Sequence, residues 1–150
     1  MTHILITGAT GFVGQNLVGQ FLSVDSYEIT CIVRDIQKAQ ALFGDNVNII
    51  STTDLHQLKT LKIDVVLHMA SLLTSRDDKD IIDHMIDANI TFGVKLMNAL
   101  QDKQGLRFIN FGSFAEYRNG AGAPDCAYLY SATKQAFRPL LVYYASRLNW

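Results

Sequence analysis

Apolar residues in this chain gather in short β-branched runs that alternate with longer amphipathic stretches. The short runs predict strands at residues 3–7, 29–33, 47–50, 65–68 and 107–111. The longer stretches repeat apolar residues every three or four positions and predict helices at 12–22, 36–43, 79–101 and from about 129 onwards. Alternation of this kind is typical of βαβ units, so the sequence predicts an α/β fold with a parallel sheet.

The same pattern predicts which side chains are buried. In the helix at 12–22 the apolar residues, beginning with Phe12 and Val13, are spaced to face the sheet. The run at 65–68 is continuously apolar, as in a strand buried on both faces. Pro139 lies inside the last helix, where its missing N–H and its ring predict a kink.

Composition narrows the class of protein. The 150 residues suffice for one domain with a real core, and 13 Lys and Arg nearly balance 14 Asp and Glu. This balance gives no electrostatic reason to expect nucleic acid or an anionic membrane as a partner. No apolar run approaches the roughly 20 residues of a membrane helix. Two cysteines, Cys31 in a strand and Cys126 in a loop, favour a reducing cytoplasm over a disulfide framework.

Three glycines follow the first strand in the stretch Gly8-Ala9-Thr10-Gly11-Phe12-Val13-Gly14. Gly8 permits a sharp turn, Gly11 lets a pyrophosphate approach the backbone, and Gly14 lets the helix pack closely on the strand. Free N–H groups and the positive end of the helix dipole meet the ligand's charge. The alternative is an ordinary turn, but a strand before and a helix after the glycines favour dinucleotide binding by this loop.

Tyr130 and Lys134 stand four residues apart, which places them one turn apart on one face of a helix. A tyrosine with a pKa of about 10 is a poor acid or base at neutral pH, and a nearby ammonium group stabilises its phenolate. Ser113 follows the strand at 107–111, at the edge where open α/β sheets bind ligands. These three are the candidates for proton transfer; the alternatives are an exposed helical pair and an ordinary turn serine.

Together these motifs resemble the extended short-chain dehydrogenases/reductases, which include nucleotide-sugar epimerases, dehydratases and reductases. The resemblance rests on T-G-A-T-G-F-V-G at 7–14, N-F-G-S-F-A-E-Y at 110–117 and Y-S-A-T-K at 130–134. The middle stretch is similar to the family's S-S-x-x-V-Y-G. The resemblance implies a Rossmann-type doubly wound parallel sheet over residues 1–150, with Ser113, Tyr130 and Lys134 as catalytic residues.

Further site residues are implied by the resemblance alone. Asp54 and Leu55 match the acid and aliphatic residue that hold the adenine, and His68-Met69-Ala70-Ser71 matches the H-x-A turn beside the cofactor. Asn89 matches the asparagine of N-x-x-G-x-x-x-L, here one residue longer, with a structural or proton-relay role. The expected cofactor contacts are Gly8, Thr10, Gly11, Phe12, Val13, Gly14, Arg34, Asp54, Leu55, Met69, Ala70, Ser71, Tyr130 and Lys134.

The choice of cofactor depends on the end of the second strand. Val33 stands where NAD-binding relatives usually carry an acid that grips the ribose hydroxyls, and Arg34 follows it. An arginine there can pair with a 2′-phosphate, which favours NADP. NAD stays the alternative because Arg34 can instead be a solvated charge paired with Asp35. His68 ends a buried strand and is interpreted as a packed residue; no other His or Cys has zinc-site spacing, so no metal is expected.

The resemblance also bears on the reaction. Relatives that eliminate water carry Asp-Glu where this chain has Phe114 and Ala115, and Glu116 comes one residue late. We therefore expect reduction of the 4-keto group of a nucleotide-diphosphate sugar with NADPH. The alternatives are a 4-epimerase with tightly bound NAD and a non-catalytic dinucleotide-binding sensor or scaffold.

Two expectations concern the rest of the molecule. Relatives bind substrate through a region that would follow Trp150, so the chain is expected to be a fragment without the C-terminal substrate region. Relatives commonly dimerise through the long helix and the Tyr/Lys helix. Apolar Phe92, Met97, Tyr143 and Leu148 permit a homodimer of this kind.

Overall fold

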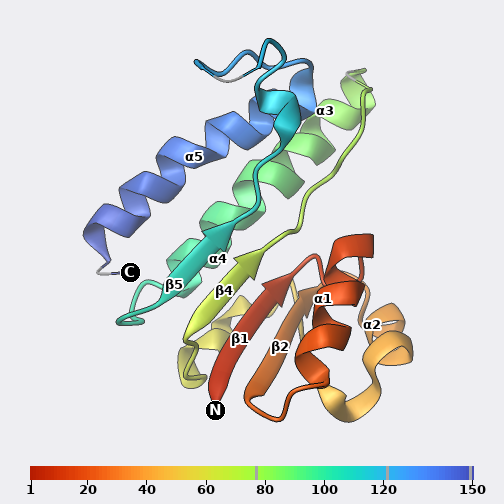
Figure 1. The fold of residues 1–150 in the computed structure, drawn as a ribbon, viewed down its shortest axis with the longest axis vertical. Coiled ribbons are helices and arrows are strands. Elements are labelled where there is room, and N and C mark those ends of the chain that lie inside the picture. Colours follow the sequence, from red (N-terminus) through yellow and green to blue (C-terminus); the bar gives the residue numbers. More distant parts are fainter. Residues whose placement is uncertain (77, 121, 149) are drawn as a thin grey trace.

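A single parallel sheet organises the computed structural model, which describes residues 1–76, 78–120, 122–148 and 150. The strand order is β3-β2-β1-β4-β5 (Figure 1). The strands are β1 (Thr2–Thr7), β2 (Tyr27–Val33), β3 (Asn48–Ser51), β4 (Val65–His68) and β5 (Arg107–Asn110). This confirms the predicted fold class, and every predicted strand end lies within two residues of the observed one.

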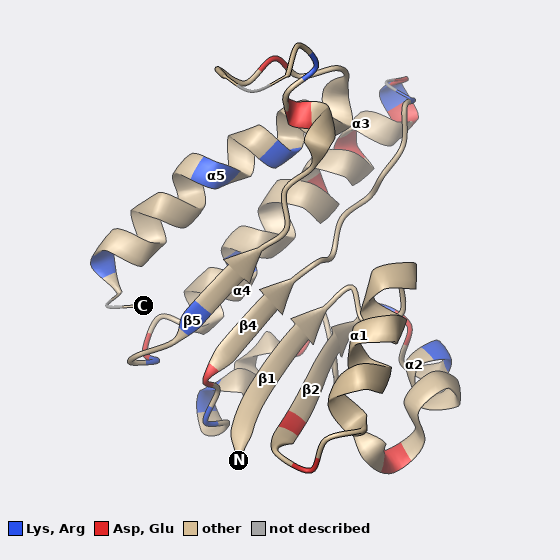
Figure 2. Cartoon of the chain, in the orientation of Figure 1, with Lys and Arg blue, Asp and Glu red and all other residues tan. Residues whose placement is uncertain are grey.

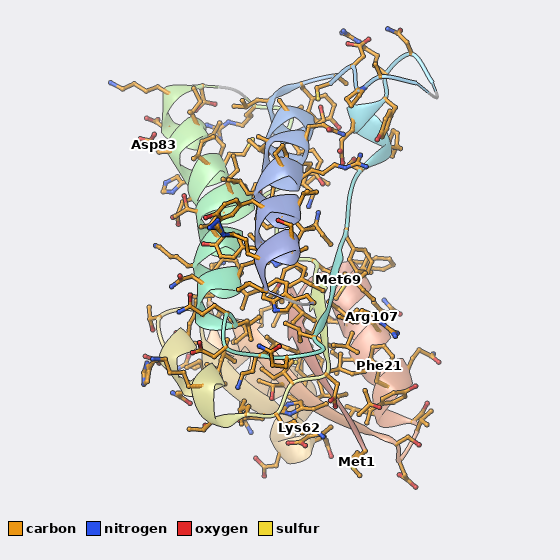
Figure 3. The ribbon with its side chains drawn as sticks, turned by 90° about the vertical axis from the view of Figure 1, so that its left-hand side faces the viewer. Met1, Phe21, Lys62, Met69, Asp83 and Arg107 are labelled. Atoms are coloured by element: carbon orange, nitrogen blue, oxygen red, sulfur yellow. The ribbon has the colours of Figure 1, made fainter. Side chains whose placement is uncertain are left out.

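Helices cover both faces of the sheet (Figure 1). They are α1 (Phe12–Leu22), α2 (Ile36–Phe43), α3 (Lys79–Ile86), α4 (Phe92–Ala99) and α5 (Leu129–Arg147), with the short helical segments η1 (Gly44–Asn46), η2 (Leu55–Thr60), η3 (Asp87–Thr91) and η4 (Phe114–Glu116). One face carries α1 and α2; the other carries the α3–η3–α4 helix and α5, which lie side by side (Figures 1 and 3). No helix in the described ranges is long and apolar enough to span a bilayer.

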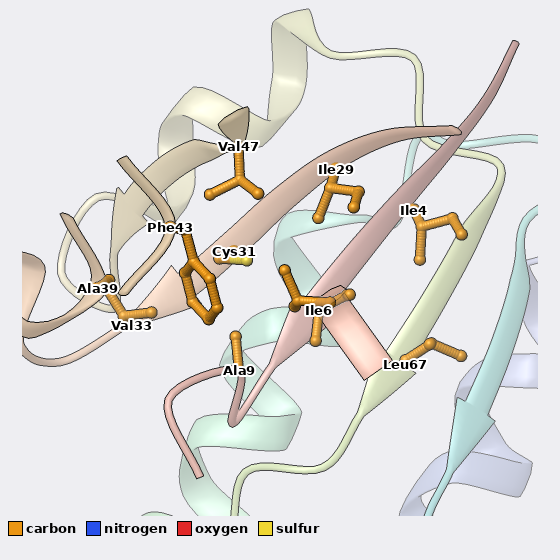
Figure 4. Close-up of a cluster of buried hydrophobic side chains, with 11 residues drawn as sticks. Ile4, Ile6, Ala9, Ile29, Cys31, Val33, Ala39, Phe43, Val47 and Leu67 are labelled. Atoms are coloured by element: carbon orange, nitrogen blue, oxygen red, sulfur yellow. The ribbon is translucent and has the colours of Figure 1, made fainter. Parts of the chain in front are cut away.

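The alternation of side chains along β1 builds a core on each face. Ile4 and Ile6 belong to a cluster with residues of α1 and α2 (Figure 4), whereas Leu5 belongs to a second cluster with residues of α4 and η2. Strands buried on both faces have continuous apolar runs, as predicted for β4. Charged residues accordingly lie mainly in helices and loops, and the strands are largely free of them (Figure 2).

The predicted inward face of α1 is wrong at its start. Phe12 is 86% exposed and Val13 is 52% exposed, whereas Gly14 and Val18 are buried. Because each residue turns an α-helix by about 100°, Phe12 lies about 160° away from Gly14 and points away from the sheet. In α5 the helix continues through Pro139.

The predicted long helix contains a π-helical segment, η3, between α3 and α4. A π turn holds one more residue than an α turn, and Asn89 lies within this segment. Met97 on α4 is fully buried, so it is unavailable to a partner chain and that part of the dimer prediction is wrong. Phe92 is half-buried and packs against the second core cluster.

Candidate active site

A cavity of about 750 Å³ lies at the carboxyl edge of the sheet, bounded by the segments that follow β1, β2, β3 and β4. Open α/β sheets bind ligands at this edge, and the volume lies within the range of small-molecule sites. Seven of the predicted cofactor contacts line it: Gly8, Thr10, Gly11, Arg34, Met69, Ala70 and Ser71. The residues present therefore fit a dinucleotide.

The loop after β1 fits closely against the loop after β4. Gly8 has a φ of +73°, and a Cβ on it would lie 2.8 Å from the backbone nitrogen of Ala70. The Thr7 hydroxyl accepts a hydrogen bond from that nitrogen at 3.1 Å and also bonds His68 Nδ1 at 2.8 Å. Only glycine fits at position 8, so the glycine is a requirement of the loop geometry and leaves the backbone open toward the cavity.

The end of β2 contributes two basic residues to the cavity. Arg34 lines it as predicted, together with Lys38, which the sequence analysis missed. The available signal was proximity in the sequence, because Lys38 lies in the first turn of α2, four residues after Arg34. Asp35 begins α2 instead: its Oδ1 accepts a hydrogen bond from the Lys38 backbone nitrogen at 2.9 Å. The sequence analysis kept NAD as the alternative cofactor because of Asp35, and the structure shows that the carboxylate of this residue caps α2.

The α3–η3–α4 helix forms a further wall that the sequence analysis also missed. Its lining residues are Ile81, His84, Asp87, Ala88, Phe92 and Lys95. An apolar repeat predicts which stripe of a helix is buried, but it does not say which flank of that stripe borders a cavity.

Seven predicted cofactor contacts lie outside this cavity: Phe12, Val13, Gly14, Asp54, Leu55, Tyr130 and Lys134. Gly14 packs against the loop instead, since a Cβ on it would lie 2.3 Å from the carbonyl oxygen of Gly8. Leu55 packs against the core cluster beneath α4. The seven residues outside the cavity stay predictions, whereas the lining of the cavity supports the seven predicted contacts that were named first.

A second, smaller cavity of about 290 Å³ lies beyond β5, between the segment that follows this strand and α5. Ser113 and Lys134 line it together, with Glu116, Tyr117 and Arg138. Tyr130 is buried one turn before Lys134 and lines neither cavity. Burial lowers the pKa of Lys134, and the nearby Glu116 opposes part of that effect.

Asn89 connects the two regions. Its Oδ1 accepts a hydrogen bond from the Leu72 backbone nitrogen at 2.6 Å, and its Nδ2 donates to the Leu72 carbonyl at 3.2 Å and to Thr133 Oγ1 at 2.9 Å. Thr133 in turn donates to the Tyr130 carbonyl at 2.7 Å. The side chain thus ties a loop of the larger cavity to the helix of Tyr130 and Lys134, which supports the structural role over the proton relay.

His68 is packed inside the protein. Its ring lies within 6 Å of the ring centres of Phe92, Phe108 and Phe137. Burial, helped by the charge of Lys134, lowers the pKa of His68 to about 3, so the ring is neutral at physiological pH. Across the described part of the chain, no three His, Cys, Asp or Glu residues gather in a way that could hold a metal ion.

Comparison with known families decides the relationship. The sequence profile of the NAD-dependent epimerase/dehydratase family matches residues 4–149. The chain belongs to this family. The match confirms the resemblance that was inferred from the sequence motifs.

Several solved structures share the fold of this chain. The chain is similar to the UDP-glucuronic acid 4-epimerase of Bacillus cereus in complex with UDP-glucuronic acid and NAD (26% identity, TM-score 0.82, 98% of this chain and 53% of that one). The UDP-glucose 4-epimerase of Thermotoga maritima (16%, 0.82, 98% and 52%) and that of Brucella ovis in complex with NAD (15%, 0.80, 99% and 49%) share the fold. Comparison with curated protein sequences gave no match. The chain thus spans about half the length of these family structures.

Proposed function

We propose that this chain forms the dinucleotide-binding and proton-transfer part of an enzyme that transfers hydride at C4 of a nucleotide-linked sugar, as a 4-epimerase does. The observation that carries the proposal is the cavity beyond β5, which Ser113 and Lys134 line together. Lys134 lies one helical turn after Tyr130 on α5. The larger cavity with its glycine loop supports dinucleotide binding beside it. The similar structures that hold NAD and a UDP-sugar favour the same chemistry.

Each residue has a distinct task in this proposal. A nicotinamide dinucleotide, when bound, supplies the hydride chemistry. The phenol oxygen of Tyr130 exchanges a proton with the substrate oxygen, and the ammonium group of Lys134 stabilises the phenolate. The Ser113 hydroxyl hydrogen-bonds the same substrate oxygen while charge develops on it.

The test replaces the phenol without changing its surroundings. Tyr130→Phe should lower turnover by about 10²–10⁴-fold and leave dinucleotide binding unchanged. Tyr128→Phe is the matched control, because Tyr128 has no lysine four residues later. Wild-type turnover in Tyr130→Phe would contradict the acid–base role. A whole protein that binds dinucleotide but converts none of a panel of UDP-sugars and keto-sugars would favour the sensor or scaffold alternative.

A second candidate function, reduction of a 4-keto sugar with NADPH, is favoured by Arg34 and Lys38 on the cavity wall. No carboxylate stands at Val33, and Asp35 is used by α2. The stoichiometry separates the two functions: an epimerase regenerates its cofactor and causes no net absorbance change at the nicotinamide band, whereas a reductase consumes one NADPH for each sugar.

The cofactor preference has its own test, by fluorescence titration. Arg34→Ala and Lys38→Ala should each weaken NADPH binding by about 10-fold or more, because each removes a charge-assisted bond to the 2′-phosphate, and NADH binding should change little. Lys62→Ala is the control, since Lys62 is exposed and does not line the cavity. NADPH binding no tighter than NADH would contradict a preference for NADP.

We also propose that the chain self-associates through α5. Val142 and Tyr143 are large apolar side chains of this helix that are 60% and 54% exposed. Analytical ultracentrifugation should give a dimer that Tyr143→Glu dissociates. A wild-type monomer at micromolar concentration would refute this.

A further inference from the structure

Glu116 is a buried carboxylate that the proposed reaction leaves without a task. It is 5% exposed at the end of η4, three residues after Ser113. In the S-S-x-x-V-Y-G pattern that this segment resembles, valine takes its place. Removing a carboxylate from water is unfavourable unless hydrogen bonds or an opposite charge compensate. The contacts of Glu116 therefore indicate what it does.

Two donors hold the Glu116 carboxylate. Its Oε1 accepts a hydrogen bond from the Ser113 backbone nitrogen at 2.5 Å, and its Oε2 accepts one from Gln135 Nε2 on α5. Space for it comes from Gly112, because a Cβ there would lie 3.1 Å from Oε1. The carboxylate thus clamps the turn that carries Ser113 against the helix that carries Tyr130 and Lys134.

The charges around Lys134 give the carboxylate a second effect. Lys134 is 6% exposed and shares the smaller cavity with Glu116. The titratable or charged groups around it are Glu116 and Tyr117 from the segment after β5, neutral His68 from β4, and Tyr130 and Arg138 from α5. Asp87 of η3 borders the other cavity. Among the described groups around the ammonium, Glu116 is the carboxylate that can balance its charge.

We propose that Glu116 is a positioning residue for the proton-transfer centre: its carboxylate fixes the Ser113 turn on α5 and keeps the buried Lys134 charged. The role in turnover rests on the proposed function, but the effect on Lys134 does not. Burial lowers the pKa of Lys134, and the charge of Glu116 opposes part of that lowering. A charged Lys134 is what makes Tyr130 competent in proton exchange.

The decisive experiment titrates Lys134 directly. Lysine side-chain signals are followed by NMR from pH 6 to 12 in the wild type and in Glu116→Gln, and the Lys134 signal is assigned by its loss in Lys134→Arg. Glu116→Gln keeps an oxygen for the Ser113 nitrogen, and Gln135 can turn its amide to bond the new one, so the variant removes charge and little else. The pKa of Lys134 should fall by about one pH unit or more.

Gln135→Leu is the matched control, because it removes the hydrogen bond to Glu116 and leaves the charge. It should leave the pKa of Lys134 near its wild-type value. An unchanged Lys134 titration in Glu116→Gln, or an equal fall in Gln135→Leu, would overturn the proposal.

Turnover gives the second readout. In Glu116→Gln the alkaline fall of kcat/KM should move to lower pH together with the Lys134 titration, whereas Gln135→Leu should lower kcat without moving it. A shifted titration with an unmoved pH profile would refute the part of the proposal that concerns proton transfer and keep the charge pairing. Failure of the proposed function would be recognised separately, by wild-type turnover in Tyr130→Phe.

Discussion

Gly93 offers a sharp test of how the two helices that carry site residues are packed. It lies in α4, where a Cβ would come within 2.5 Å of two ring carbons of Phe137 and within 3.1 Å of His68 Nε2. Phe137 is 1% exposed, so neighbouring atoms enclose its ring and keep it from moving away from an added methyl group. The glycine, which is unfavourable in a helix, is thus explained by the close approach of α5.

The expected free-energy change follows from two opposing effects. Gly→Ala in a helix interior stabilises by about 0.8–1.0 kcal/mol through helix propensity. Forcing an extra methyl group into a packed core costs about 1–3 kcal/mol. Gly93→Ala should therefore lower the free energy of unfolding, by up to about 2 kcal/mol. Gly19→Ala in α1 should raise it by about 1 kcal/mol, because nothing lies within 4 Å of the added Cβ.

Urea unfolding followed by circular dichroism measures both variants. The difference between them isolates the clash, since the propensity effect is common to both. Phe137→Leu removes the two ring carbons and leaves His68 Nε2 in place, so Gly93→Ala should cost less stability in Phe137→Leu than in the wild type. Equal free energies of unfolding in Gly93→Ala and Gly19→Ala, within about 0.5 kcal/mol, would refute the close approach of α4 and α5.

Three further predictions concern buried polar groups. Because the folded pKa of His68 is about 3 and its ordinary value is 6.5, its contribution to stability is complete above pH 6.5 and is lost as pH falls toward 3, with a slope of about 1.4 kcal/mol per pH unit. Acid titration of unfolding should therefore show a shallower slope in His68→Gln than in the wild type, and an equal slope would contradict it. Asn89→Ala removes the hydrogen bonds to the Leu72 backbone and to Thr133 Oγ1 and should destabilise by roughly 1–3 kcal/mol, measured as a lower urea midpoint; an unchanged midpoint would contradict it. Burial raises the pKa of the Cys31 thiol to about 12, so a thiol reagent at pH 8 should label Cys126 alone in the native chain and both cysteines in urea.

The sequence predicts β1, β2 and β4 well because these strands are largely buried on both faces, and burial leaves continuous apolar runs such as 65–68. It predicts the glycine loop because a φ of +73° at Gly8 requires that residue. The inward face of α1 fails because an apolar residue in the first turn counts toward the periodicity although Phe12 points to solvent. Contacts between distant segments, such as Glu116 with Gln135, leave no periodic signal.

The π-helical segment η3 connects the larger cavity with α5. Asn89 lies in η3, and from there it reaches the Leu72 backbone on one side and Thr133 on the other. An uninterrupted α-helix would contain one residue fewer before Gly93, so Asn89 and Gly93 could not both keep their present contacts, the first with Thr133 and the second with Phe137. The π turn therefore lets one helix contact a loop of the larger cavity and two turns of α5 at once. Since Thr133 lies directly before Lys134, the position of the ammonium group depends on the same contacts that shape the dinucleotide cavity.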